Sequence, residues 1–176
     1  VWNTYFATTK KTLLETAANH ADNEIMLRTK VTELITDKDG KVVGVKGEQY
    51  DGTPVTIHAK KGVVLATGGY AADIKRVMET NDYWADGDIT TNTRTTNRSS
   101  LVGSGIDMAE AVGAATTGMG FTQMMPISWV DNGNLAFGGG HYAIYINPTT
   151  GKRFVNETGE RDVLSLAEFE NGVSFN

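Results

Sequence analysis

The sequence predicts an α/β fold with an α+β tendency, organised around a mixed sheet. Helix-like and strand-like segments alternate along the 176 residues, which is the pattern of an α/β domain. A continuous apolar run, Val63–Leu65, suits a strand buried on both faces, as in a parallel sheet. Shorter strand-like runs before it are separated by turn sequences, Asp37–Gly40 and Asp51–Pro54, which indicate antiparallel hairpins beside that strand.

The composition limits the classes of protein to which the chain can belong. It is 40% hydrophobic and 21% charged, which is ordinary for a globular domain. The formal net charge of −5 argues against a nucleic-acid or anionic membrane surface. The chain has no cysteine, which excludes disulfides, cysteine nucleophiles and Cys-ligated metal centres in this segment. No apolar run approaches the length of a membrane span, and His20 and His58 lack metal-ligand spacing.

The N-terminal third is predicted to be a helix followed by a small β region. Residues 1 to about 20 form the helix, with Phe6, Leu13 and Ala17 along one face. Residues 24–66 form the β region, in which Ile57 is expected to point inward. The strands expected before the Gly62 strand are Glu24–Thr29, Val31–Thr36, Lys41–Gln49 and Val55–Ala59.

The segment Gly62–Tyr70 is the first candidate binding site. Its predicted strand ends in Ala66, Thr67, Gly68 and Gly69, which carry almost no side-chain bulk. Adjacent glycines permit positive φ and let another group approach the backbone closely. Ligands of open α/β sheets bind just beyond the carboxyl ends of the strands. A flat or phosphate-bearing ligand is therefore expected here, and the alternative interpretation is a strand followed by an ordinary glycine turn.

A second helix is predicted from Gly103-Ser-Gly105 through about Ala115, with Ser104 or Asp107 as its cap. The glycines invite comparison with the dinucleotide-binding fingerprint. However, Met108 occupies the sixth position, and the residues before the glycines make a poor strand. We therefore reject an independent Rossmann site, although a helix N-terminus still favours negative groups.

Four stretches in order resemble the fumarate reductase and succinate dehydrogenase flavoprotein family, which includes urocanate reductases and ketosteroid dehydrogenases. They are Gly62–Tyr70, Thr91–Ala115, Gly120–Pro126 and Gly151–Asp162. The resemblance implies FAD as the cofactor. It also implies that the residues in contact with FAD are Val31, Ala66, Thr67, Gly68, Gly69, Gly103 and Ser104. For Val31, simple core packing is an equally good interpretation.

The last of these stretches, with Arg161-Asp162 at its end, resembles the family motif Gly-x-Arg-Phe-x-Asn-Glu…Arg-Asp. In that family, the arginine at the position of Arg161 protonates the double bond opposite the hydride from flavin N5. Arginine side chains have pKa values above about 12, so this role requires strong negative charge in the transition state. The alternatives are binding of a substrate carboxylate or enolate, and a surface salt bridge with Asp162, Glu157 or Glu160.

Three features depart from the family pattern. Met125 stands where the family has a histidine near the substrate carboxylate, and methionine is a poor hydrogen-bonding group without charge. Fumarate is therefore disfavoured as the acceptor, and a bulkier or more apolar acceptor is favoured. Ser104 replaces a usual aspartate. The family's glutamate and arginine of a proton route are absent between Leu135 and His141, which leaves His141 as a candidate proton carrier or a structural hydrogen-bonding residue.

The sequence thus predicts a fragment of an FAD-dependent reductase of an activated C=C bond in an enoate-type substrate. Residues 1–122 are assigned to the later part of an FAD-binding domain and residues 123–176 to the beginning of a capping (substrate) domain. The alternatives are a related ketosteroid-type dehydrogenase, and a non-catalytic module that binds a nucleotide or a partner. The expected partners are a small unsaturated substrate and an unidentified electron donor, without nucleic acid or a membrane span.

The isolated 176-residue chain is expected to lack bound FAD and activity. It is also expected to self-associate, because a truncated sheet exposes unpaired edges and apolar surface.

Overall fold

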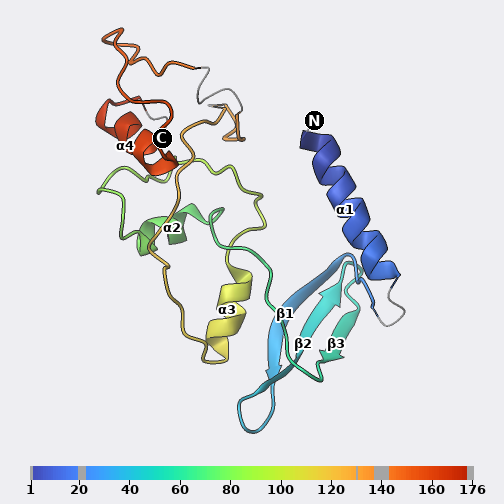
Figure 1. Ribbon diagram of the computed structural model, residues 1–176. Helices are drawn as coiled ribbons and strands as arrows, with labels where there is room; N and C mark the ends of the chain where they lie inside the picture. Colours follow the sequence, from blue (N-terminus) through green and yellow to red (C-terminus); the bar gives the residue numbers. More distant parts are fainter. Residues whose placement is uncertain (1, 20–22, 130, 137–142, 174–176) are drawn as a thin grey trace. The chain divides into compact units, whose positions relative to one another are not determined.

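The computed structural model describes residues 2–19, 23–129, 131–136 and 143–173 (Figure 1). They contain helices and antiparallel strands in the order α1, β1, β2, β3, α2, α3, α4, so the expected mixture of both is confirmed. The chain divides into two compact units, Val1–Val63 and Val64–Asn176. Among the described residues, no helix has the length and apolar character needed to cross a membrane.

The first unit consists of helix α1, Trp2–Ala18, and a three-stranded antiparallel sheet of order β1-β2-β3 (Figure 1). The strands are Thr29–Thr36, Val42–Gln49 and Pro54–His58. The expected helix and meander are therefore confirmed. The turn between β1 and β2 forms for local reasons, because the Asp37 carboxylate accepts the N–H groups of Asp39 and Lys41 at 2.9 and 3.0 Å.

Two expectations for the first unit were wrong. The strand Glu24–Thr29 does not form, because Arg28 adopts a positive φ of 55° and interrupts the extended backbone, so that β1 begins only at Thr29. Ile57 is 42% exposed rather than inward. Val31 lies half-buried in β1, opposite Gly47 of β2, which is the environment of an ordinary sheet residue.

The second unit contains helices α2, Ile74–Thr80, α3, Ser104–Ala111, and α4, Arg161–Glu170, joined by long irregular segments. Its core contains Val77, Trp84 and Ile89, against which Met124 and Phe169 pack. The Trp84 indole donates a hydrogen bond to the Thr122 carbonyl at 2.7 Å. Packing around Trp84 therefore brings α2, α4 and the segment near residue 122 together.

The segment Gly62–Tyr70 is not a strand, which corrects the central structural expectation. Its backbone from Val63 onward pairs with no strand of the described chain, and Val64 is 90% exposed. A strand requires a neighbour to satisfy its N–H and C=O groups, and an apolar run alone does not supply one.

Helix boundaries in the second unit also differ from the expectations. Helix α2 was not expected, although Asp73 caps it by accepting the N–H of Arg76. Helix α3 ends at Ala111, before Gly113, whose φ is 88°. No side chain caps α3, so neither Ser104 nor Asp107 has the expected role. Helix α4 begins at Arg161.

Within the irregular segment 81–97, Trp84 and Ile89 are buried. Farther along the described chain, an isolated antiparallel bridge joins Ile146 to Arg153.

Large apolar side chains are exposed in both units. Examples are Leu27, Val64, Phe121 and Trp129. They agree with the expectation of self-association, which stays a prediction. The division into a domain over residues 1–122 and a second over residues 123–176 also stays a prediction.

Candidate functional site

The first candidate site is a glycine-rich junction, which we define as residues 66–69 together with residues 103–105. The N–H of Gly103 donates to the Gly69 carbonyl at 3.1 Å. A Cβ atom placed on Gly105 would lie 1.9 Å from the Thr67 hydroxyl oxygen. The junction therefore depends on glycine at position 105, because any side chain there would separate the two segments.

The backbone of this junction is open to a ligand. Residues 66–69 are exposed, and a Cβ added to Gly69 would meet no atom within 4 Å. Gly103, with a φ of 85°, is the N-cap of α3 and provides no side-chain hydrogen bond to the first turn. Within the described chain, the N-cap residue therefore supplies no side-chain acceptor to the N–H groups of that turn. A helix N-terminus of this kind suits an electron-rich group.

Arg76 holds the two segments of the junction together, and the sequence analysis missed it. Its Nη1 atom lies 2.6 Å from the Asp107 carboxylate and its Nη2 atom 3.8 Å from Glu110. The guanidinium also lies over the Tyr70 ring, 4.9 Å from its centre. The hydrogen bond to Asp107 raises the pKa of Arg76. Its charge is satisfied within the protein, so we assign it a structural role.

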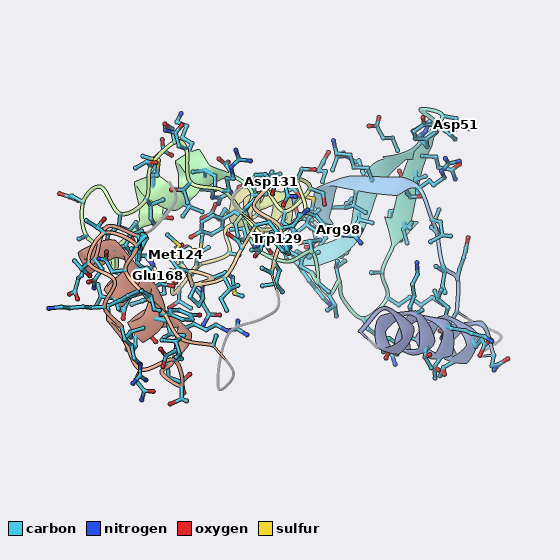
Figure 2. The ribbon with its side chains drawn as sticks, turned by 90° about the horizontal axis from the view of Figure 1, so that it is seen from above. Asp51, Arg98, Met124, Trp129, Asp131 and Glu168 are labelled. Carbon is cyan, nitrogen blue, oxygen red and sulfur yellow. The ribbon has the colours of Figure 1, made fainter. Side chains whose placement is uncertain are left out.

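The second candidate site is a cavity of about 280 Å³ in the same unit. Its walls come from α2, from residues 93–97, from residues 122–129 and from α4. Figure 2 labels two of the lining residues, Met124 and Glu168, and Glu168 belongs to α4. The lining combines apolar groups, such as Val77 and Phe169, with a few polar ones, such as Ser165 and Glu168. Ligand sites commonly have this composition.

Arg161 begins α4 and contacts the wall of this cavity. Its Nη1 atom lies 3.3 Å from Oε1 of Gln123 and 3.6 Å from Sδ of Met125, and both residues line the cavity. No carboxylate of the described chain lies within salt-bridge distance of Arg161. The interpretation of Arg161 as a surface salt bridge was therefore wrong for this part of the chain.

Two of the three carboxylates expected to compete for Arg161, those of Asp162 and Glu157, have other partners. The Asp162 carboxylate accepts the Tyr83 hydroxyl at 3.3 Å. The buried Glu157 carboxylate accepts the Tyr145 N–H at 2.9 Å and forms a two-point pair with Arg153. The hydrogen bond from Arg153 is the main reason that the pKa of Glu157 falls from 4.5 to about 2. Neither of these two carboxylates therefore neutralises the guanidinium of Arg161.

Ser165 and Glu168 are cavity residues that the sequence analysis did not single out. Ser165 is 1% exposed, and its Oγ atom has no hydrogen-bond partner in the described chain. Burial raises the pKa of Glu168 from 4.5 to about 7. Both lie on the face of α4 that begins with Arg161, at spacings of four and three residues. That helical spacing was the available signal.

The structure brings some of the expected site residues together and leaves others apart. Thr67, Gly69 and Gly103 meet at the glycine-rich junction, with Ala66, Gly68 and Ser104 beside them. Arg161 is exposed and contacts two residues that line the cavity, Gln123 and Met125. Val31 lies in the first unit, and His141 lies outside the described residues.

Residues 3–175 match the sequence profile of the FAD binding domain family. The chain belongs to this family. FAD is therefore its cofactor, as the resemblance in the sequence implied.

Curated relatives and a solved structure agree with this assignment. The chain is 43% identical over 154 residues to an NADH:acrylate oxidoreductase of Vibrio harveyi, covering 86% of this chain and 15% of that protein. It is 33% identical over 155 residues to an acrylate reductase flavoprotein subunit of Shewanella woodyi, and the match covers 80% of this chain and 29% of that protein. The fold is similar to the solved structure of the open conformation of a flavocytochrome c3 fumarate reductase, with a TM-score of 0.63 and 26% sequence identity. The match covers 89% of this chain and 27% of that one. The chain thus spans less than a third of each of these proteins.

The residues of the glycine-rich junction fit an FAD. The fit rests on three observations: an exposed Gly-Gly backbone, open space at Gly69, and a first turn of α3 without a side-chain cap. Such a surface can face the flat ring system or a phosphate group of the cofactor without steric conflict.

Proposed function

We propose that the chain is part of an FAD-dependent oxidoreductase that reduces the C=C bond of a small monocarboxylic enoate, with acrylate as the test substrate. The observation that carries the proposal is the guanidinium of Arg161. Within the described part of the chain, its hydrogen-bond partners are the neutral groups of Gln123 and Met125 at the wall of a cavity. Two relatives named for acrylate support the choice of substrate.

Met125, which lies next to Arg161, favours a substrate with one carboxylate. Acrylate has a carboxylate at one end and a CH2 group at the other, whereas fumarate has a carboxylate at both ends. Met125, 3.6 Å from the guanidinium, offers an apolar surface and no strong hydrogen bond. A second carboxylate beside it would lose its hydration without gaining a partner. Of the two expectations for the acceptor, bulkier or more apolar, we adopt the second.

The glycine-rich junction is the proposed FAD contact. Ala66, Thr67, Gly68 and Gly69, with Gly103 and Ser104 at the start of α3, present exposed backbone to the cofactor. Val31 of β1 stays the proposed contact for the adenine half. When bound and reduced, FAD supplies a hydride to the β carbon of the enoate. Negative charge then develops on the α carbon and the carboxylate oxygens.

Arg161 is the proposed partner of that charge and the donor of the proton. Its positive charge is not neutralised by a carboxylate of the described chain, so it is available to a substrate carboxylate or enolate. One N–H proton of the guanidinium moves to the α carbon, which completes the saturated acid. Gln123 accepts a hydrogen bond from the same guanidinium and holds it in position.

The test uses the full-length FAD-loaded protein, reduced anaerobically and mixed with acrylate or fumarate while the flavin absorbance is followed. Acrylate should reoxidise the flavin at least about 10-fold faster than fumarate, because fumarate leaves one carboxylate unpaired. In the Arg161→Ala and Arg161→Lys variants, the rate of flavin reoxidation by acrylate should fall about 1,000-fold, as expected for the loss of a general acid. Both variants should retain FAD.

Three results would count against the proposal. Equal rates with fumarate would refute the monocarboxylate preference. Unchanged rates in both Arg161 variants would remove Arg161 from the chemistry. Reduced flavin that reacts with no enoate would refute the reductase assignment itself.

A further inference from the structure

One face of α4 carries three polar side chains in line. Arg161, Ser165 and Glu168 follow each other at spacings of four and three residues, which places them on the same side of a helix. Ser165 is the most completely buried side chain of the described chain, yet its hydroxyl has no hydrogen-bond partner there. A buried hydroxyl without a partner is costly, and one that faces a cavity indicates that something in the cavity binds it.

The cavity connects the three residues. Ser165 and Glu168 line it directly, and the two atoms that Arg161 contacts belong to Gln123 and Met125, which line it as well. Arg161 and Glu168 are about 10 Å apart along the helix, at 1.5 Å per residue, so they do not need to touch. With a volume of about 280 Å³, the cavity has room for several bridging waters between polar partners.

We infer that this face of α4 is a proton-supply route, in which Glu168 delivers a proton through Ser165 and cavity water to Arg161. The inference rests on the proposed function, in which Arg161 gives a proton to the α carbon of the enoate. Arg161 then recovers a proton by way of the Ser165 hydroxyl, which in turn takes one from the Glu168 carboxyl group. The Glu168 carboxylate is protonated again from solvent, so one solvent proton enters for each hydride transferred.

The surroundings of Glu168 suit a group that gains and loses a proton near neutrality. Burial raises its pKa to about 7, and a donor of this kind is effective when its pKa is close to the working pH. The charged or titratable groups that face it from other elements are Arg94, whose Nη1 atom donates to the Asp131 carbonyl at 2.7 Å, and the buried hydroxyl of Tyr145.

Two other carboxylates lie on α4, the helix of Glu168. Asp162 accepts a hydrogen bond from the Tyr83 hydroxyl, and Glu170 is exposed. No cation of the described chain forms a salt bridge with Glu168. The proton on Glu168 is therefore not displaced by a fixed positive charge.

The test compares three variants of the full-length FAD-loaded protein during acrylate reduction between about pH 5 and about pH 9. Glu168→Gln should lower kcat at least about 10-fold, leave KM unchanged and abolish the fall in rate above about pH 7. Ser165→Ala should lower kcat and keep that fall. The matched control Glu170→Gln changes an exposed carboxylate on the same helix and should behave like the unchanged protein.

A second measurement does not depend on turnover. Infrared titration of the substrate-free protein should show one carboxyl group that loses its proton near pH 7 and that is absent from Glu168→Gln. Titration of this group near the ordinary value of 4.5 overturns the inference. An unchanged kcat and pH profile in Glu168→Gln overturns it too, and leaves the proposed function standing. A protein that reduces no enoate refutes the proposed function, and the proton route with it.

Discussion

The Nη1 atom of Arg161 lies 3.3 Å from the Oε1 atom of Gln123, although 38 residues separate them in the chain. This contact joins the start of α4 to the segment before Pro126. It also directs the guanidinium along the cavity wall toward Met125. The orientation of the proposed proton donor therefore depends on a neutral side chain from a distant segment.

We expect Gln123→Ala to lower the rate of acrylate reduction about 10-fold, since a hydrogen bond to a charged group contributes about 1.5 kcal/mol. FAD binding should not change, because Gln123 lies outside the glycine-rich junction. Stopped-flow reoxidation of the reduced flavin measures the effect, and Gln123→Asn serves as the conservative control. Identical rates in all three proteins would show that this hydrogen bond does not position Arg161.

Met125→His should increase the rate of fumarate reduction relative to acrylate by at least about 10-fold. An imidazole next to Arg161 can donate a hydrogen bond to a second carboxylate, which a thioether cannot do. Met125→Leu preserves the apolar surface and should give no gain with fumarate. Competition between the two substrates in one reaction measures the ratio, and an equal gain in the leucine variant would contradict the explanation.

Gly69→Ala separates a folding role of the glycine-rich junction from a cofactor role. The added Cβ meets no protein atom within 4 Å, so the thermal unfolding midpoint of the FAD-free protein should hardly change. If FAD lies against this backbone, the methyl group should raise the Kd for FAD at least about 10-fold, because the ligand is displaced from close contact.

Flavin fluorescence titration measures the Kd of this variant. Gly105→Ala is the contrasting variant, since its Cβ would lie 1.9 Å from the Thr67 hydroxyl oxygen. It should reduce stability as well as FAD binding. Unchanged affinity in Gly69→Ala would exclude Gly69 as a contact.

Glu157 should make the stability of the second unit sensitive to acid. Its pKa falls from 4.5 to about 2 in the folded protein, so the native state binds this proton less readily than the unfolded state. The stabilisation is present above about pH 4.5 and is lost as the pH falls toward 2. Glu157→Gln should therefore lower the unfolding midpoint at pH 7, with a smaller difference at about pH 3.

Thermal unfolding at the two pH values checks this expectation. Glu160→Gln is the control, because Glu160 is exposed and the carboxylate that pairs with Arg153 in the described chain is that of Glu157. A constant difference between the Glu157 variant and the unchanged protein at both pH values would contradict the assignment of the Arg153 pair.

Local chemistry made several features of this chain predictable. The turn at Asp37–Gly40 follows from a carboxylate that accepts nearby N–H groups and from a glycine with positive φ, so both sides of the hairpin are encoded within a few residues. The motif residues Ala66–Gly69, Gly103 and Arg161 indicated the FAD-binding family that the profile confirmed. These signals depend on residue type and short spacing, which a linear sequence displays.

Features that depend on distant partners could not be obtained in this way. The apolar run before Ala66 indicated a strand, but a strand forms only beside another one, and none of the described strands pairs with it. Helical spacing places Glu168 on the same face of α4 as Arg161, but nothing local shows that Glu168 is enclosed whereas Glu170 is exposed. Its raised pKa arises because the chain from residue 122 onward and helix α4 enclose it together. Burial is a property of segments that meet in space, and only the folded chain determines which segments meet.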